Sequence, residues 1–243
     1  NDADYIFLDA GNDYVHQRND IRDAINKGVD VLVVFPSYPD SLVQVLDEAY
    51  QKGIKIVLAD RASDKIKYHN FVGTNDVQIG QMAAEYILAN LHGNITVIEL
   101  MGPRQSITAN QRHAGFTAAF KHNANISVDH VLYGNWNAVD SFRAVDSVLS
   151  AGYVPDVIFA HNDMQAYNAR LACRKHHMSP VIIGVDGVAL AGGGVDMVLN
   201  GDIDATFYNP TAAKESVKNA MALLRGENIE QTEWLEPFLI DKS

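Results

Sequence analysis

The chain of 243 residues contains one cysteine, which excludes an internal disulfide. That residue, Cys173, lies in the segment AYNARLACRKHH, whose pattern is typical of a helix. A cysteine in such a place is more often a small apolar packing residue than a reactive thiol. The cysteine count therefore does not reveal whether the protein works in a reducing or an oxidising compartment.

Basic runs and long apolar runs are missing as well. No run of Lys or Arg exceeds two residues, and the formal net charge is -11, which argues against nucleic acid as a partner and against a polybasic membrane patch. No apolar stretch approaches the roughly 18 residues of a membrane span. The first residues, NDADYIFLDAG, lack the pattern of a signal segment, so we expect any signal or anchor to have been removed.

Short apolar runs alternate with amphipathic stretches along the whole chain, which predicts repeated βα units and an α/β fold with mostly parallel sheets. The expected strands cover residues 5–10, 31–35, 54–59, 95–100, 128–133, 157–160, 181–185 and 205–208. The expected helices cover residues 18–27, 41–51 with Ser41 as the N-cap, 75–91, 106–121, 139–149, 163–175 and 212–224.

We expect two Rossmann-like, doubly wound domains joined by a hinge. The N-terminal domain would comprise residues 1–74 and 208–232, and the C-terminal domain residues 75–207 and 233–243. No flexible tether separates them, so ordinary strand-like crossovers would join them and would favour hinge bending.

Five apolar runs end on small polar or charged clusters: VLVVFPS, IVLADR, VIFAHND, VIIGVDG and IDATFYNP. In open α/β sheets, ligands bind outside the carboxyl ends of the parallel strands. The polar residues that follow these runs, Asp60, Arg61, Asn162, Asp186 and Asn209, are therefore expected to face one cleft.

The segments ADR, QRHAGF, AHND and GVDG, in this order and with this spacing, resemble the ribose-type periplasmic sugar-binding proteins, which have the type I periplasmic binding fold. The resemblance extends over essentially the whole chain. It is similarly close to the extracytoplasmic sugar-sensing domains of hybrid two-component regulators, toward which the segment ATFYNPT leans.

The resemblance implies a monosaccharide ligand, a pentose or hexose such as ribose or fructose, bound in the cleft with hinge closure. The implied ligand-binding residues are Asp60, Arg61, Arg112, Trp136, Asn162, Asp186 and Asn209, with Trp136 covering an apolar face of the sugar ring. It implies no cofactor, no metal and no catalytic residue. The implied partners are a membrane sensor kinase module or an ABC permease, and the implied location is the periplasm.

Two departures from the family pattern have consequences. Phe35 stands where ribose-binding members carry an amide, so fewer hydrogen bonds are available there for ribose. Family members also open with a strand and helix of about thirty residues before the segment matching YIFLDAGND. We therefore expect an exposed slot in the first domain and a reduced ligand affinity.

Two other classes of function remain alternatives. An effector domain of a lactose-repressor-type transcription factor has the same fold, but would need a basic helix-turn-helix upstream. A sugar-modifying enzyme is possible on fold alone, and His161 could be a general base, yet no nucleophile motif accompanies it. Cys173, His176 and His177 match no common zinc spacing.

Overall fold

The computed structural model describes residues 3–242, which form two compact units. Unit 1 comprises the chain up to Thr74 together with Thr211–Leu235, and unit 2 comprises Asn75–Pro210 together with the residues from Glu236 onward. The chain passes between them after Thr74, Pro210 and Leu235. The boundaries expected at 208 and 232 lie three residues before those of the structure.

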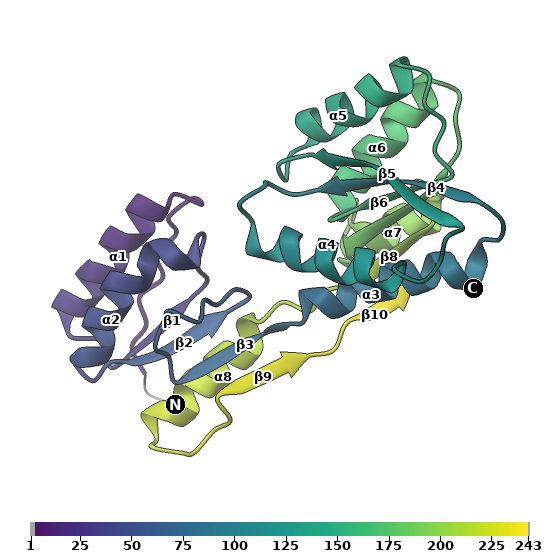
Figure 1. The fold of residues 1–243 in the computed structure, drawn as a ribbon. Coiled ribbons are helices and arrows are strands. Elements are labelled where there is room, and N and C mark those ends of the chain that lie inside the picture. The colour runs from purple at the N-terminus through teal and green to yellow at the C-terminus, as the bar shows by residue number, and fades with distance from the viewer. Residues whose placement is uncertain (1–2, 243) are drawn as a thin grey trace. The chain divides into compact units, whose positions relative to one another are not determined.

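Unit 1 is a four-stranded parallel sheet covered on both faces (Figure 1). Its strands are β1 (Val31–Val34), β2 (Lys55–Ala59), β3 (Asn70–Thr74) and β9 (Thr232–Leu235), in that spatial order. Its helices are α1 (Tyr14–Lys27), a 3-10 turn at Pro39–Leu42, α2 (Val43–Gln51) and α8 (Ala213–Leu224).

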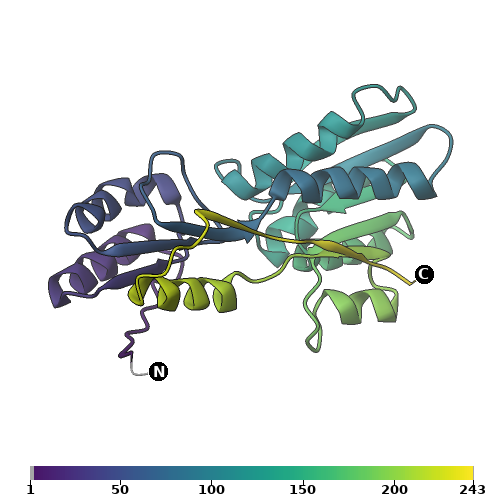
Figure 2. The ribbon, with the colours of Figure 1, turned by 90° about the horizontal axis from the view of Figure 1, so that it is seen from below.

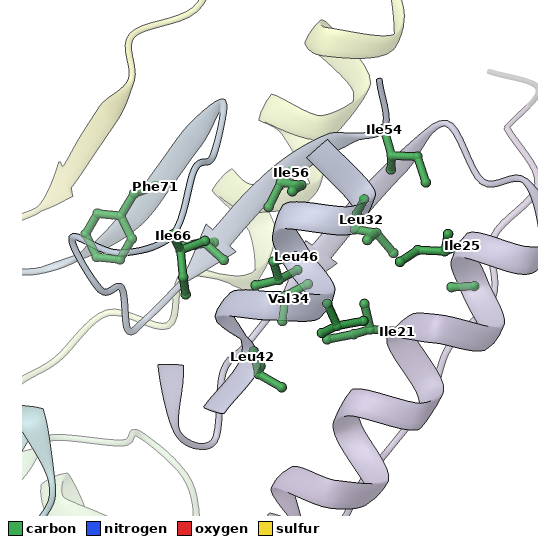
Figure 3. Packing of buried hydrophobic residues seen from close by; sticks show 14 residues of the cluster. Ile21, Ile25, Leu32, Val34, Leu42, Leu46, Ile54, Ile56, Ile66 and Phe71 are labelled. Atoms are coloured by element: carbon green, nitrogen blue, oxygen red, sulfur yellow. The ribbon is translucent and has the colours of Figure 1, made fainter. Parts of the chain in front are cut away.

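Successive side chains of β2 serve opposite faces of this sheet, as strand geometry requires. Ile56 and Leu58 pack in the core that α1 and α2 cover, where Figure 3 shows Ile21 and Ile25 facing β1. Val57 and Ala59 belong to the opposite core, which Ala220 of α8 covers (Figure 2). The apolar run KIVLA is therefore a strand buried on both faces.

Two expectations for unit 1 are wrong. Residues 5–10 form no strand, and Tyr5 and Phe7 are 90% and 83% exposed. Strand β1 is the end strand of the described sheet and pairs only with β2, so residues 5–10 add no ladder to it. Ser41 is not a helix N-cap, because its hydroxyl donates to the Tyr38 carbonyl within the 3-10 turn. Strand β3 was not predicted.

Unit 2 is a doubly wound sheet of six strands in the order β10-β8-β7-β6-β4-β5. These are β4 (Ile95–Met101), β5 (Ile126–Tyr133), β6 (Val157–Ala160), β7 (Val181–Asp186), β8 (Ala205–Tyr208) and the antiparallel β10 (Phe238–Ile240). Helices α3 (Asp76–Asn90) and α4 (Ile107–Ala119) pack on one core of the sheet. Helices α5 (Ala138–Ser150), α6 (Asp163–Lys175) and α7 (Gly194–Asn200) pack on the other.

The predicted α/β class with doubly wound parallel sheets is confirmed by this topology. Strands β6 and β8 and helix α6 have the predicted bounds, and the other predicted helices and strands that form differ by one to four residues. The short helix α7 and the strands β9 and β10 were not predicted. None of the helices within residues 3–242 is long and apolar enough to cross a membrane.

A reciprocal pair of glycines sets the distance between α3 and α4. A Cβ on Gly80 would lie 2.0 Å from the carbonyl oxygen of Arg112, and a Cβ on Gly115 would lie 2.0 Å from that of Val77. Both obstacles are backbone atoms, which cannot rotate away. The two helices can therefore approach this closely only because glycine stands at both positions.

We expect Gly115→Ala to destabilise unit 2 by about 2 kcal/mol, because overpacking against backbone outweighs the better helix propensity of alanine. Urea unfolding followed by far-UV circular dichroism would measure the change. Gln111→Ala, at an exposed position of the same helix, is the control and should leave the midpoint unchanged. An unchanged midpoint for Gly115→Ala would show that the close contact is not required.

Candidate functional site

Three of the candidate residues in unit 2 follow three neighbouring parallel strands. Asn162 follows β6, Asp186 ends β7 and Asn209 follows β8, and these strands are adjacent in the sheet. Neighbouring strands lie about 4.8 Å apart, so their carboxyl ends bring these residues to one edge of the sheet. Parallel pairing of Asp186 with Tyr208 and a hydrogen bond of 3.1 Å from Asn209 N–H to the Asp186 carbonyl fix two of them together.

Asn162 caps a helix, and this role also fixes the orientation of its side chain. It is the N-cap of α6, and its side-chain Oδ1 accepts from the Gln165 N–H at 2.8 Å. Because the oxygen is engaged, the amide Nδ2 is the group that remains to donate to a ligand. The residue is half-buried, which keeps this donor in a defined position.

Arg112 is held inside unit 2 by two acceptors. Its Nε donates to Asp76 Oδ1 at 2.8 Å and its terminal nitrogen donates to the His161 carbonyl. The side chain is only 3% exposed. A guanidinium has five N–H donors in one plane, so these contacts fix its orientation and leave further donors for a ligand next to Asn162.

Trp136 lies in the loop between β5 and α5. Its ring packs on Gly102, just after β4, where an added Cβ would lie 2.1 Å from the ring atom Cζ2. Asn135 and Trp136 have φ values of 52° and 55°, both in the left-handed region. The loop therefore presses one ring face against backbone near the strand ends, at a cost in backbone strain.

Asp60 and Arg61, in unit 1, follow the buried strand β2. Arg61 N–H bonds to the Ala59 carbonyl at 2.7 Å, and Asp60 has a φ of 68°, so Asp60 is the centre of a strained γ-turn. Arg61 pairs with Asp60 at 3.3 Å and also donates to the Pro36 carbonyl, which follows β1, at 3.3 Å. A carboxylate and a guanidinium thus stand together at the ends of two adjacent strands.

Positive φ is concentrated among the candidates. Asp60, Trp136 and Asp186, with φ values of 68°, 55° and 114°, are three of the six non-glycine residues of this kind in the described chain. Backbone strain of this type persists where surrounding structure holds it, and it clusters at ligand sites. This favours a binding role for the strand-end residues over a role in local turns alone.

A buried network that the sequence did not predict lies next to Arg112. Glu99 of β4 is fully buried and contacts His113 Nδ1 at 2.7 Å and His161 Nε2 at 3.0 Å. Burial raises the pKa of Glu99, but the hydrogen bonds from the two histidines outweigh it, so the pKa lies below its usual value. Burial lowers the pKa of His161. The His161 side chain is fully buried and bonded to Glu99, so it orients its neighbours and has no exposed ring atom that could act as a general base.

Asp163 was also overlooked, although it is part of the AHND segment. It is the first residue of α6 and its carboxylate is buried. At the sequence level an Asp there is explained by the preference for acidic residues in the first turn of a helix. Only its contacts with β8 and the loop after β7 show that it has another role.

No group of three or more metal-ligating side chains is found among the residues that the structure describes. Cys173 is buried in the core, and burial raises its pKa to about 11. His176 contacts Asp146 at 2.7 Å instead of pointing to a shared centre. The grouping of Cys173, His176 and His177 is therefore part of the packing and the end of α6.

The Glu99 network predicts a pH dependence of stability. The hydrogen bond that His113 donates to the Glu99 carboxylate raises the pKa of His113 above 6.5. His113 therefore contributes stability that is fully present below pH 6.5 and is lost as the pH rises through its raised pKa. Urea unfolding of the parent and His113→Gln should differ more at pH 5.5 than at pH 9. His122→Gln, at a nearby exposed histidine, is the control, and parallel curves for parent and His113→Gln would contradict the expectation.

Comparison with known proteins gives consistent relatives. The chain is 28% identical to a ribose import binding protein of Bacillus subtilis over 75% of this chain and 59% of that protein. It is 33% identical to the transcriptional repressor PurR of Klebsiella pneumoniae over 68% of this chain and 48% of the repressor. The chain thus spans 59% of the length of the first relative and 48% of the length of the second.

A solved structure matches more completely. The fructose-binding periplasmic domain of a hybrid two-component system superimposes with a TM-score of 0.90 at 30% identity, covering 96% of this chain and 78% of that one. The family pattern described as "Periplasmic binding protein domain" matches residues 1–228. The resemblance inferred from the sequence is confirmed, and the chain belongs to the periplasmic binding protein domain family.

Proposed function

We propose that the protein binds a monosaccharide, a pentose or hexose such as ribose or fructose, through the strand-end residues of both units. The observation that carries the proposal is the row of Asn162, Asp186 and Asn209 at the ends of three adjacent strands, beside the fixed guanidinium of Arg112. This row combines a carboxylate, two amides and a cation without a metal cluster among the described residues.

The chemistry of this set suits a neutral polyol. Each sugar hydroxyl both donates and accepts, so a carboxylate that accepts from two adjacent hydroxyls is complemented by amide and guanidinium donors. The ring of Trp136 offers the flat apolar surface that a sugar ring face prefers. A sugar with one inverted hydroxyl would leave a partner unpaired, which is how such a site distinguishes stereoisomers.

Asp60 and Arg61 supply a second carboxylate and guanidinium in unit 1. In our proposal they bind the same sugar, so that a ligand favours the hinge-closed state because only that state lets both units contact it. The three chain crossings give such a hinge its covalent basis. No chemical step is required of any residue, and we propose binding without catalysis.

The downstream device is a membrane sensor kinase module or an ABC permease, and the site of action is the periplasm. The 30% identity to the periplasmic fructose-binding domain of a two-component system supports the sensor, and the 28% identity to a ribose import protein supports transport. The match to PurR supports a second candidate, the effector domain of a transcriptional repressor. Sugar-responsive DNA binding by the full gene product would distinguish that candidate.

Isothermal titration calorimetry with a panel of pentoses and hexoses, up to millimolar sugar, tests the proposal. We expect one stereochemical class to bind, and Asp186→Ala to weaken its binding about tenfold to a hundredfold. That range corresponds to the roughly 1.5 to 3 kcal/mol of a hydrogen bond to a charged group. Asn162→Ala should weaken it less, because a neutral donor is lost.

Glu85→Ala is the matched control, because it removes an exposed carboxylate from α3 of the same unit. It should bind as the parent does. The proposal fails if the folded parent binds no sugar of the panel, or if Asp186→Ala binds with the parent's affinity.

A further inference from the structure

The carboxylate of Asp163 lies at a junction of four elements of unit 2. From the start of α6, its Oδ1 accepts the Thr206 hydroxyl of β8 at 2.6 Å, and its Oδ2 accepts the N–H of Gly187, just after β7, at 2.7 Å. The residue is 5% exposed. Burying a carboxylate costs free energy even when it is hydrogen-bonded, so a gain elsewhere must offset that cost.

Two glycines make room for this carboxylate. A Cβ on Gly184 of β7 would lie 2.2 Å from Asp163 Oδ1, and a Cβ on Gly194, the first residue of α7, would lie 2.0 Å from Oδ2. The strand and the helix on either side of the β7 to α7 loop are thus both fitted around one acidic group. Packing alone does not require an ionisable group at this position.

The bond to Gly187 fixes the backbone of Asp186. The N–H that Asp163 accepts belongs to the peptide group directly after Asp186, whose φ of 114° is unfavourable for a residue with a side chain. The carbonyl of that same peptide group accepts from Asn209. Asp163 therefore clamps the peptide that carries Asp186 and anchors Asn209, while its own chain neighbour is Asn162.

We propose that Asp163 is a positioning residue for the sugar site, one that holds Asp186 in its strained conformation and makes sugar affinity depend on the protonation of a buried acid. The inference rests on the proposed function. Asp163 itself does not touch the sugar; it acts through Gly187 and Asp186.

The charges around Asp163 give the sign of the pH effect. The pKa of Asp163 is raised to about 7, chiefly by burial and also by the Asp186 carboxylate, while the bonds from Thr206 and Gly187 and the charge of Arg112 oppose the rise. A protonated Asp163 can donate to Thr206 and still accept from Gly187, so the clamp survives protonation. A bound sugar that excludes water from Asp186 strengthens the repulsion between the two carboxylates. Sugar binding should therefore take up a proton and weaken as the pH rises through about 7.

Three variants separate the clamp from the charge. Asp163→Asn keeps an acceptor for Gly187 and mimics the protonated acid. Its affinity should match the parent's at pH 6 and lack the severalfold loss that the parent shows by pH 8.5. His113 titrates in both proteins, so the difference between the two pH profiles isolates Asp163.

Thr206→Val removes a bond that lowers the pKa of Asp163, so its profile should shift to higher pH. Asp163→Ala removes the clamp and should bind at least tenfold more weakly at every pH.

Amide hydrogen exchange at Gly187 measures the stability of its hydrogen bond to Asp163 in the absence of sugar. Asp163→Ala should exchange at least tenfold faster than the parent, and Asp163→Asn at about the parent's rate. Asp204→Ala is the matched control, because it removes a carboxylate that accepts from the Ile182 N–H near the other end of β7. If no sugar binds while Gly187 behaves as expected, the proposed function fails and the clamp stands. Unchanged exchange in Asp163→Ala, or a parent-like pH profile in Asp163→Asn, overturns the inference.

Discussion

The shared direction of the strands in unit 2 is the constraint on which the rest depends. Because β5, β4, β6, β7 and β8 are all parallel, every one of them delivers its following loop to the same edge. Residues as distant in the sequence as Trp136 and Asn209 therefore come to the same edge of the sheet. The core needs only apolar residues in the strands themselves, so the strand ends are free to carry polar chemistry.

Placing polar residues at this edge of the sheet costs free energy, because several of the charged side chains near it are buried. Arg112 is satisfied by Asp76 and by the His161 carbonyl, Glu99 by two histidines, and Asp163 by Thr206 and Gly187. Buried charges add little to stability even when they are paired. What they provide is orientation, since each fixes a backbone or side-chain group that faces the strand ends. The Gly80 and Gly115 contact supports the same arrangement by holding α4, and with it Arg112, against α3.

The sequence predicted the parts of this structure that depend on local pattern. Helix α6 has a periodic pattern, strand β6 is a short apolar run with clear ends, and both have the predicted bounds. The run YIFLDA at residues 5–10 is apolar enough for a strand but pairs with no strand of the described sheet, because the partner that a strand needs is not contained in its own sequence. Strand β3, NFVGT, has only two large apolar residues, Phe71 and Val72, so its sequence does not signal a strand, yet it lies between β2 and β9. Asp163 looked like an ordinary first-turn acid, since only the tertiary fold brings Thr206 and Gly187 to it.

Asp186 combines an unfavourable φ with a neighbouring buried carboxylate, Asp163, and two hydrogen bonds hold the peptide group that follows it. Its φ of 114° would relax if the following peptide could rotate, and the Asp163 and Asn209 bonds oppose that rotation from its two ends. A site held this way loses little conformational freedom when a ligand arrives, which favours tight and selective binding. The carboxylates of Asp163 and Asp186 are close enough to repel each other. Removing water from them strengthens that repulsion, which opposes ligand binding while both are charged. In the proposed sugar site, a carboxyl with a pKa of about 7 relieves that conflict, because it can become neutral when the ligand excludes water.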